Sequence, residues 1–480
     1  MTLQIGTRAD FTLNSYREVA WRGRAIGFAP AALRRIAECR KSFMQLIDSD
    51  SNLTIYGVTT GYGQNASRRV PPDERRRHAQ KPPLAAAAAF GPPLPERVAR
   101  GIVFARLANY VEGHAAVTVG LAEAVAALLG GGRLPKVSAM GQGGAGEICG
   151  LAPLFIPLTL KFELAEKESL ALVNGSPCAS ALIADAAIAM DRRLPLIEQV
   201  LALSAEAIKA PLEAYAPEFD ELWSDPHEAA ALQSLRHLLS GGARERRPYQ
   251  APVSYRILPR VLGQFRRALA AARDVAERSL RAVSDNPTYL PPDADHPHGR
   301  VYSNGGYHNG GAYPALDNLA AAAADICTIA DKHASKLLDG RYSLLPDRLE
   351  VGEGHIGCLN MVLVGYAEEA KRAAQRTFLP GSEGGGFGQN DTAPPTFIAW
   401  RGQEQAAFCL DAALTALAIV ASQAFFVTDR AAPPALRSLL EEIRVQVPPV
   451  TAARAMAPDA ERLLSALRDR IYDVAPNVRD

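Results

Sequence analysis

The stretch Gly143-Gly144-Ala145-Gly146-Glu147-Ile148-Cys149-Gly150-Leu151-Ala152-Pro153-Leu154 carries more information about this chain than any other segment. Two of its side chains, Glu147 and Cys149, are chemically reactive. A carboxylate can transfer a proton or bind an amine, and a thiol can act as a nucleophile. We therefore treat Glu147 and Cys149 as candidate catalytic residues.

The length and composition of the chain predict a large globular protein. Its 480 residues exceed the usual size of one hydrophobic core, so two or more regions that share an apolar interior are expected. Apolar residues make up 48% of the chain, yet no run looks long and pure enough to cross a bilayer, and we expect no membrane partner. The first residues, Met1 to Ile5, lack the features of a signal peptide, which predicts a cytoplasmic protein.

The pattern of charged residues and cysteines gives no indication of a nucleic-acid or metal site. A net charge of +1 gives no reason to expect nucleic acid or an anionic membrane. The basic run Arg75-Arg76-Arg77 is short, which favours a solvated loop or local ion pairs. The six cysteines include no CxxC pair, and His296-Pro297-His298 has no matching Cys/His pair, so we expect reduced thiols and no metal.

Apolar periodicity predicts a mainly α protein, because strand-like alternation is sparse and several long segments repeat at helical spacing. In the first part of the chain, Gly101–Leu129 is expected to be helical. Further along, the predicted helices are Leu258–Val283, Ala315–Leu338, Cys358–Phe378, Thr396–Val427 and Ala452–Val474. Several are apolar around their whole circumference, which is typical of helices inside a bundle. We therefore predict an N-terminal domain (1–200) that carries the 143–154 loop, followed by a central helical bundle with C-terminal helices (201–480).

The glycine-rich run Gly384-Gly385-Gly386-Phe387-Gly388 resembles a phosphate-binding loop only superficially. It lacks the preceding strand and the Lys-Ser/Thr pair that such loops require. We interpret it as an active-site loop.

Seven separated motifs, in the same order, resemble those of the histidine, phenylalanine and tyrosine ammonia-lyases, which form the aromatic amino acid lyase family. Over the 143–154 stretch these enzymes read Gly-Ser-Val-Gly-Ala-Ser-Gly-Asp-Leu-Ala-Pro-Leu. The other matching motifs are Tyr56-Gly57-Val58-Thr59-Thr60-Gly61-Tyr62-Gly63, Lys167–Ser176, Gln250–Arg256, Ser284–Pro287, Gly305–His308 and Gln389–Asp391. The resemblance covers most of the chain and implies the ammonia-lyase (fumarase/aspartase-like) fold with its long central helix bundle. It also implies a homotetramer whose active sites draw on three chains.

The residues retained at matching positions outline a site for an amino-acid-like anion. Tyr56 occupies the position of the family's catalytic base. Arg256 offers planar donors suited to a bidentate grip on a carboxylate. Asn174 is expected to hydrogen-bond a carboxylate or a developing oxyanion. Further pocket-lining residues are expected to be Gln250, Tyr307 and Asn390.

The residues that carry the family's chemistry have changed. In the family, Ala-Ser-Gly cyclises and dehydrates into the electrophile 4-methylidene-imidazol-5-one (MIO). Aligned without gaps, this tripeptide is Glu147-Ile148-Cys149 here, and the Asp that follows it is Gly150. The family's Ser-His falls on Ala85-Ala86, and its second active-site tyrosine falls on Val253. Because all these changes affect one pocket, they predict a site without MIO and without any other cofactor.

A shift of one residue leaves an alternative open. Cyclisation needs a backbone amide nitrogen, usually of glycine, to attack the carbonyl two residues back, and the middle residue must lose its β-substituent. Ile148-Cys149-Gly150 meets both requirements, since a cysteine thiol can be eliminated to the same dehydroalanine. The shift implies a one-residue deletion before Leu151.

Three functions are compatible with these patterns. The first is an enzyme that acts without MIO on a carboxylate-bearing, amino-acid-derived substrate, with Tyr56 as acid or base and Arg256 as the carboxylate anchor. Since MIO is what makes aromatic deamination fast, elimination of a better leaving group, addition, isomerisation or cyclisation is expected. The second is a non-catalytic scaffold or binding protein with a filled or collapsed pocket, in which Glu147 forms a salt bridge and Arg256 is the candidate partner. The third is a MIO lyase that uses the shifted ring.

Overall fold

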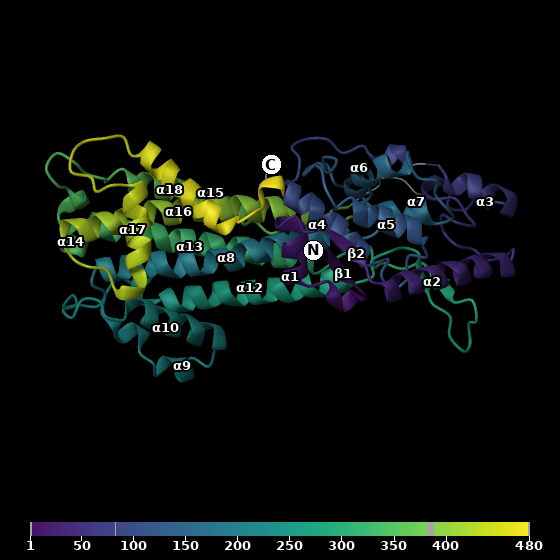
Figure 1. Cartoon of the computed structure of the whole chain (residues 1–480). Coiled ribbons are helices and arrows are strands. Elements are labelled where there is room, and N and C mark those ends of the chain that lie inside the picture. The colour runs from purple at the N-terminus through teal and green to yellow at the C-terminus, as the bar shows by residue number, and fades with distance from the viewer. Residues whose placement is uncertain (1, 82, 382–387, 479–480) are drawn as a thin grey trace.

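The computed structural model describes residues 2–81, 83–381 and 388–478, and most of the predicted loop at Gly384–Gly388 lies outside them. The described chain is mainly helical, which confirms the predicted class (Figure 1). Its α-helices are α1 (Leu13–Tyr16), α2 (Pro30–Ser49), α3 (Pro72–Ala79), α4 (Glu96–Leu107), α5 (Val119–Ala127), α6 (Ile148–Thr159), α7 (Glu168–Val173), α8 (Pro177–Ala207), α9 (Phe219–Leu222), α10 (Pro226–Leu239), α11 (Val253–Arg256), α12 (Leu258–Arg281), α13 (Ala312–Leu338), α14 (Gly340–Ser343), α15 (Leu359–Ala373), α16 (Thr396–Val427), α17 (Arg437–Gln446) and α18 (Ala457–Ile471).

The long helices form a central bundle. Helix α13 packs against α8, α12, α15 and α16, and α16 also packs against α8 and α15. Every residue from Cys409 to Phe425 of α16 is buried, as expected for a helix surrounded by others. A buried ion pair joins two of the helices, because Arg193 of α8 donates to both carboxylate oxygens of Asp411 on α16 at 2.8 and 3.0 Å.

The two ends of the bundle carry different elements. Figure 1 shows α2, α3, α5, α6 and α7 at one end, and α9, α10, α14 and α17 at the other. Two short sheets complete the fold. Strands β1 (Leu3–Ile5) and β2 (Ile26–Phe28) are parallel, with Leu3 opposite Ile26, and strands β3 (Thr288–Leu290) and β4 (Arg300–Tyr302) are antiparallel, with Thr288 opposite Tyr302.

The predicted helices beyond residue 200 are confirmed, with ends that differ by a few residues. The single helix predicted over Gly101–Leu129 is wrong, since α4 and α5 are separate. Gly113 lies between them in the left-handed region (φ +83°), where an added Cβ would lie 2.4 Å from Cys39 Sγ. Thr118 then begins α5 by accepting a hydrogen bond from Leu121 N. Position 113 must therefore be glycine, and the chain turns there.

Among the residues that the structure describes, two helical segments are long and apolar enough, by length and composition, to cross a membrane. They are Glu168–Ala207 and Thr396–Val427, and their most apolar windows are 100% and 89% buried inside the protein. The expectation that no segment would reach this length and hydropathy is therefore wrong, and burial in the bundle accounts for the apolar composition. Helix α8 also crosses residue 200, so it connects the two predicted domains, whose boundary stays a prediction.

Candidate active site

A cavity of about 430 Å³ lies beside α7 and the segment before α6. Its polar lining comes from segments far apart in sequence, among them Tyr56, Tyr62, Asn174, Asn286, Tyr307 and Asn390. Ile148, Leu170 and Val173 supply apolar surface, and Ala85 and Ala86 lie where the family has Ser-His. None of the described lining residues is charged. The structure thus brings four of the predicted residues together, namely Tyr56, Asn174, Tyr307 and Asn390.

Tyr56 presents its phenol oxygen at the cavity wall. The backbone N–H of Gly63 donates a hydrogen bond to Tyr56 Oη at 3.0 Å. This donor stabilises negative charge on the oxygen after it has lost its proton. Tyr62 lies nearby, and burial together with the charge of Tyr56 raises the pKa of Tyr62. Tyr62 therefore stays protonated at neutral pH.

Asn174 is fixed at the end of α7 by two close contacts. Its Nδ2 donates to the carbonyl oxygen of Asn286 at 2.9 Å. Its Oδ1 lies 2.2 Å from where a Cβ on Gly146 would lie, and Gly146 has φ +74°. Only glycine at position 146 therefore allows the 143–150 loop to approach Asn174 this closely.

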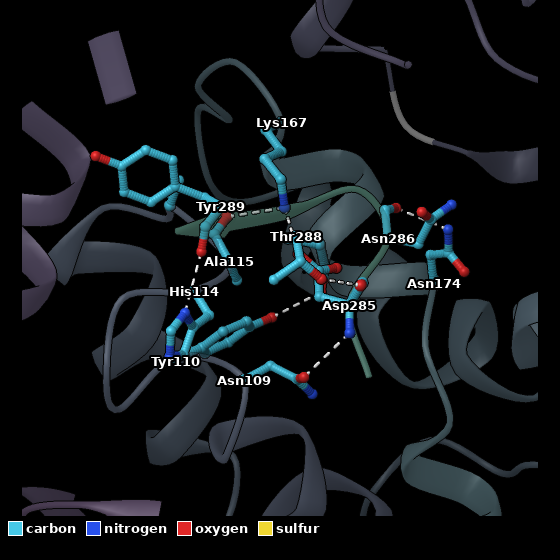
Figure 2. Close-up of polar contacts among 12 residues, drawn as sticks. Asn109, Tyr110, His114, Ala115, Lys167, Asn174, Asp285, Asn286, Thr288 and Tyr289 are labelled. Carbon is cyan, nitrogen blue, oxygen red and sulfur yellow. Dashed lines mark hydrogen bonds and ion pairs between the residues drawn. The ribbon is translucent and has the colours of Figure 1, made fainter. Parts of the chain in front are cut away.

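A buried polar network holds Asn286 and its neighbours in place (Figure 2). The Nζ of Lys167 forms an ion pair with Asp285 and donates to the carbonyl of Ala115 at 3.1 Å. Asn109 Oδ1 accepts from the backbone N–H groups of Ser284 and Asp285 at 2.7 and 3.2 Å. These contacts orient the Ser284–Pro287 motif, which carries Asn286 into the cavity wall.

Glu147 does not point into this cavity. Its carboxylate accepts hydrogen bonds from the backbone N–H groups of Cys178 at 2.6 Å and Ala179 at 2.9 Å. These are the second and third residues of α8, whose N-cap residue, Ser176, makes no side-chain capping bond. Glu147 therefore takes the place of the usual N-cap side chain, and it also interacts favourably with the helix dipole. Glu147 lines a second cavity and not this one, so its role in proton transfer or amine binding stays a prediction.

Glu147 is buried, and its surroundings shift the pKa of its carboxyl group. Burial raises the pKa of Glu147 from 4.5 to about 7, although the two amide hydrogen bonds and the positive charge of Arg106 act in the opposite direction. Arg106 of α4 is fully buried, and its guanidinium nitrogens make no hydrogen bond with the described residues. When it is ionised, the Glu147 carboxylate supplies negative charge near this buried cation.

Cys149 lies in the first turn of α6 and lines a separate cavity of about 160 Å³. This second cavity shares Ala145, Ile148 and Asn390 with the first, but Tyr56 and Asn174 do not line it. Burial raises the pKa of the Cys149 thiol. Because a thiol that stays protonated is a poor nucleophile, the predicted nucleophilic role of Cys149 gains no support here.

Arg256 and Gln250 lie apart from the cavity. Arg256 is exposed at the end of α11, directly before α12, and its Nε donates to the carbonyl of Ala251 at 3.0 Å. Asn286 follows the opposite end of α12, whose 24 residues span about 36 Å. Within one chain, therefore, Arg256 neither reaches the cavity nor pairs with Glu147, and the salt bridge considered between these two residues does not form.

The bundle and the cavity at its end define a helical lyase fold. A family model described as aromatic amino acid lyase matches residues 11–161 and 159–445, and the chain belongs to this family. The histidine ammonia-lyase of Symbiobacterium thermophilum is 28% identical over 494 residues, which cover 95% of this chain and 94% of that protein. The histidine ammonia-lyase of Streptomyces avermitilis is 30% identical over 373 residues, which cover 71% of each chain.

Solved structures support the same fold. The ergothioneine-degrading enzyme ergothionase from Treponema denticola superposes with a TM-score of 0.88 at 16% identity, covering 98% of this chain and 99% of that one. Tyrosine aminomutase from Streptomyces globisporus gives a TM-score of 0.84 at 22% identity and covers 98% of each chain. At these identities the likeness shows the fold alone.

The residues of the 143–150 loop do not fit MIO in the family register. The middle residue, Ile148, has no β-substituent that can leave, and the carboxylate of Glu147 is engaged by α8. In the shifted register Cys149 carries a leaving group, but it lines the second cavity instead of the cavity of Tyr56 and Asn174.

Asn286, Tyr62 and Ser169 also line the main cavity and were not predicted as site residues. All three lie within motifs that resemble the family's, so the motifs were the available signal. Sequence alone does not tell which residue of a motif faces the cavity, because that depends on contacts such as the bond from Asn174 to Asn286.

The titration of Glu147 should appear in the pH dependence of stability. Its folded pKa of about 7 exceeds the unfolded value near 4.5, so the folded state binds more protons between these values and stability falls as pH rises through this window. Glu147→Gln should remove this component, which amounts to roughly 3 kcal/mol. Denaturation at several pH values between 4 and 8 measures the difference, with the exposed Glu123→Gln as control. A parallel pH dependence for wild type and Glu147→Gln would refute the assignment.

Proposed function

We propose that this chain is a lyase-type enzyme that acts without MIO on a carboxylate-bearing, amino-acid-derived substrate. The observation that carries the proposal is the open cavity of about 430 Å³, in which Tyr56 and Asn174 face the same space as Ile148. The polar groups that suit substrate binding are thus kept, while an inert side chain lies at the position of the family's electrophile. A scaffold protein would instead be expected to have a filled or collapsed pocket.

In this proposal Tyr56 moves the proton. Its oxygen, which accepts a hydrogen bond from Gly63 N, removes a proton from the substrate or returns one to it. Without an electrophile to activate the amine, an ammonium group leaves slowly from an unactivated carbon. The proposal therefore favours elimination of a better leaving group, addition, isomerisation or cyclisation.

A neighbouring copy of the chain supplies the carboxylate anchor in this proposal. Among the described residues, no charged side chain lines the cavity within one chain, and Arg256 is exposed at the far end of α12. Exposed apolar residues such as Met361 (75% exposed) and Val362 (47%) on α15 provide surface for association. A homotetramer in which Arg256 and Gln250 of one copy complete the cavity of another accounts for both observations.

The proposal predicts an unmodified backbone at residues 147–150. Intact mass spectrometry should give the mass of the unmodified sequence, because Ile148 cannot form the electrophile and Cys149 lies outside the main cavity. Loss of one water and one hydrogen sulfide would show the shifted ring and overturn the MIO-free proposal.

Replacing Tyr56 should separate catalysis from binding. The protein is incubated with a library of carboxylates and amino acids, and turnover is compared between wild type and Tyr56→Phe. Loss of a general acid–base group should lower kcat by about 100-fold or more with little change in KM. Equal turnover in the two proteins would contradict the role of Tyr56. If no compound is converted while amino acids still bind, the result supports the binding-protein alternative.

Subunit mixing tests whether Arg256 acts on a neighbouring cavity. Tyr56→Phe and Arg256→Ala should each lose activity, yet chains unfolded and reassembled together should regain it, since some cavities combine an intact Tyr56 with an intact Arg256. Random assortment predicts recovery of about one quarter of wild-type activity. The double variant treated alone is the matched control. No recovery in the mixture would contradict a site shared between copies.

A further inference from the structure

A third cavity, of about 170 Å³, adjoins the main one. It lies between α3 and the segment from Gly61 to Val70, and Tyr62 lines both this cavity and the main one. Its volume corresponds to about five or six water molecules, which is enough for an oxyanion such as phosphate. We refer to it as the basic cavity.

The lining of the basic cavity is strongly cationic. Four basic side chains line it, namely Arg68, Arg69, Arg77 and Lys81, against the single acid Glu74. Two of the four are engaged elsewhere, because Arg69 donates to the carbonyls of Ser51 and Asn52 and Arg77 lies 3.5 Å from Glu74. Arg68 and Lys81 are exposed at the mouth of the cavity, and neither side chain forms an ion pair or hydrogen bond with the described residues. The cavity therefore has two cations available for a ligand.

His78 shows that these charges are close together. Its ring lies 5.3 Å from that of Tyr62, and its Nε2 is buried without a hydrogen-bond partner among the described residues. Burial, followed by the charges of Lys81 and Arg68, lowers the pKa of His78. Both cations thus act on one ring in a space with a single acid, and an anion placed there would relieve their mutual repulsion.

We propose that the basic cavity binds an oxyanionic group, such as phosphate, sulfate or carboxylate, between Arg68 and Lys81. The group belongs either to the substrate in the main cavity or to a free anion. The shared wall at Tyr62 favours the substrate, since the described lining of the main cavity includes no charged side chain. Only this choice of source rests on the proposed function, because anion binding does not require turnover.

Calorimetric titration of the full chain with inorganic phosphate at low ionic strength tests the site. Arg68→Ala and Lys81→Ala should each weaken binding by about tenfold, since each removes one charge-assisted contact. Arg68→Lys, which keeps the charge, should restore much of the affinity. Arg34→Ala is the matched control, because Arg34 is exposed on α2 and lies outside the cavity. Equal phosphate affinity in wild type and in the Arg68→Ala, Lys81→Ala double variant would overturn the proposal.

Competition identifies the source of the anion. If the group belongs to the substrate, O-phosphotyrosine should bind about tenfold more tightly than tyrosine and should displace phosphate, and Lys81→Ala should abolish this preference. If the site serves a free anion, phosphate and O-phosphotyrosine should bind independently. Both measurements report equilibrium binding and not turnover. They therefore test the anion site even if the turnover of Tyr56→Phe shows that the proposed catalytic role of Tyr56 is wrong.

Discussion

The hydrogen bonds from the N-terminus of α8 to Glu147 are the constraint on which the site depends. Two segments that are distant in the sequence contact this end of the helix. Glu147 of the 143–150 loop accepts from Cys178 N and Ala179 N, and Ser284 Oγ accepts from Ser176 N at 3.0 Å. Asn174, two residues before Ser176, bonds to Asn286. The loop, the cavity wall and the bundle therefore share one point of attachment.

The conformation of Glu147 has a free-energy cost that these bonds offset. Its backbone is left-handed (φ 53°, ψ 27°), which destabilises a residue with a side chain by about 1 kcal/mol or more. A hydrogen bond contributes about 0.5–1.5 kcal/mol, and Glu147 accepts two. The nearby charge of Arg106 adds a further attraction. Together these interactions hold Ile148 at the cavity wall.

The fold and part of the site could be predicted from the sequence, for different physical reasons. Helix α16 begins and ends at the predicted residues, because apolar side chains around a whole circumference require burial on all sides. The break between α4 and α5 was missed, since the contact of Gly113 with Cys39 joins segments far apart in sequence. Tyr56 and Asn174 were correctly placed in one cavity because their motifs resemble a family whose fold is known.

The sequence could not predict which way individual side chains point or how far apart the site residues lie. Glu147 follows a glycine-rich run, and nothing local shows that its carboxylate turns toward α8. The separation of Arg256 from the cavity follows from the length of α12, which the sequence did predict. The sequence does not show, however, that the cavity lies at the opposite end of this helix.

The capping role of Glu147 also has a consequence for the history of this loop. Alanine at position 147 would remove the acceptor for two backbone amides, while the backbone at this position would remain left-handed. Restoring serine at position 148 alone would supply a leaving group without the glycine whose nitrogen closes the ring. Each single reversal weakens the fold or yields no electrophile, because the residues act together. Under the proposed MIO-free chemistry, no single substitution at position 147 or 148 would install the family's electrophile in its usual register.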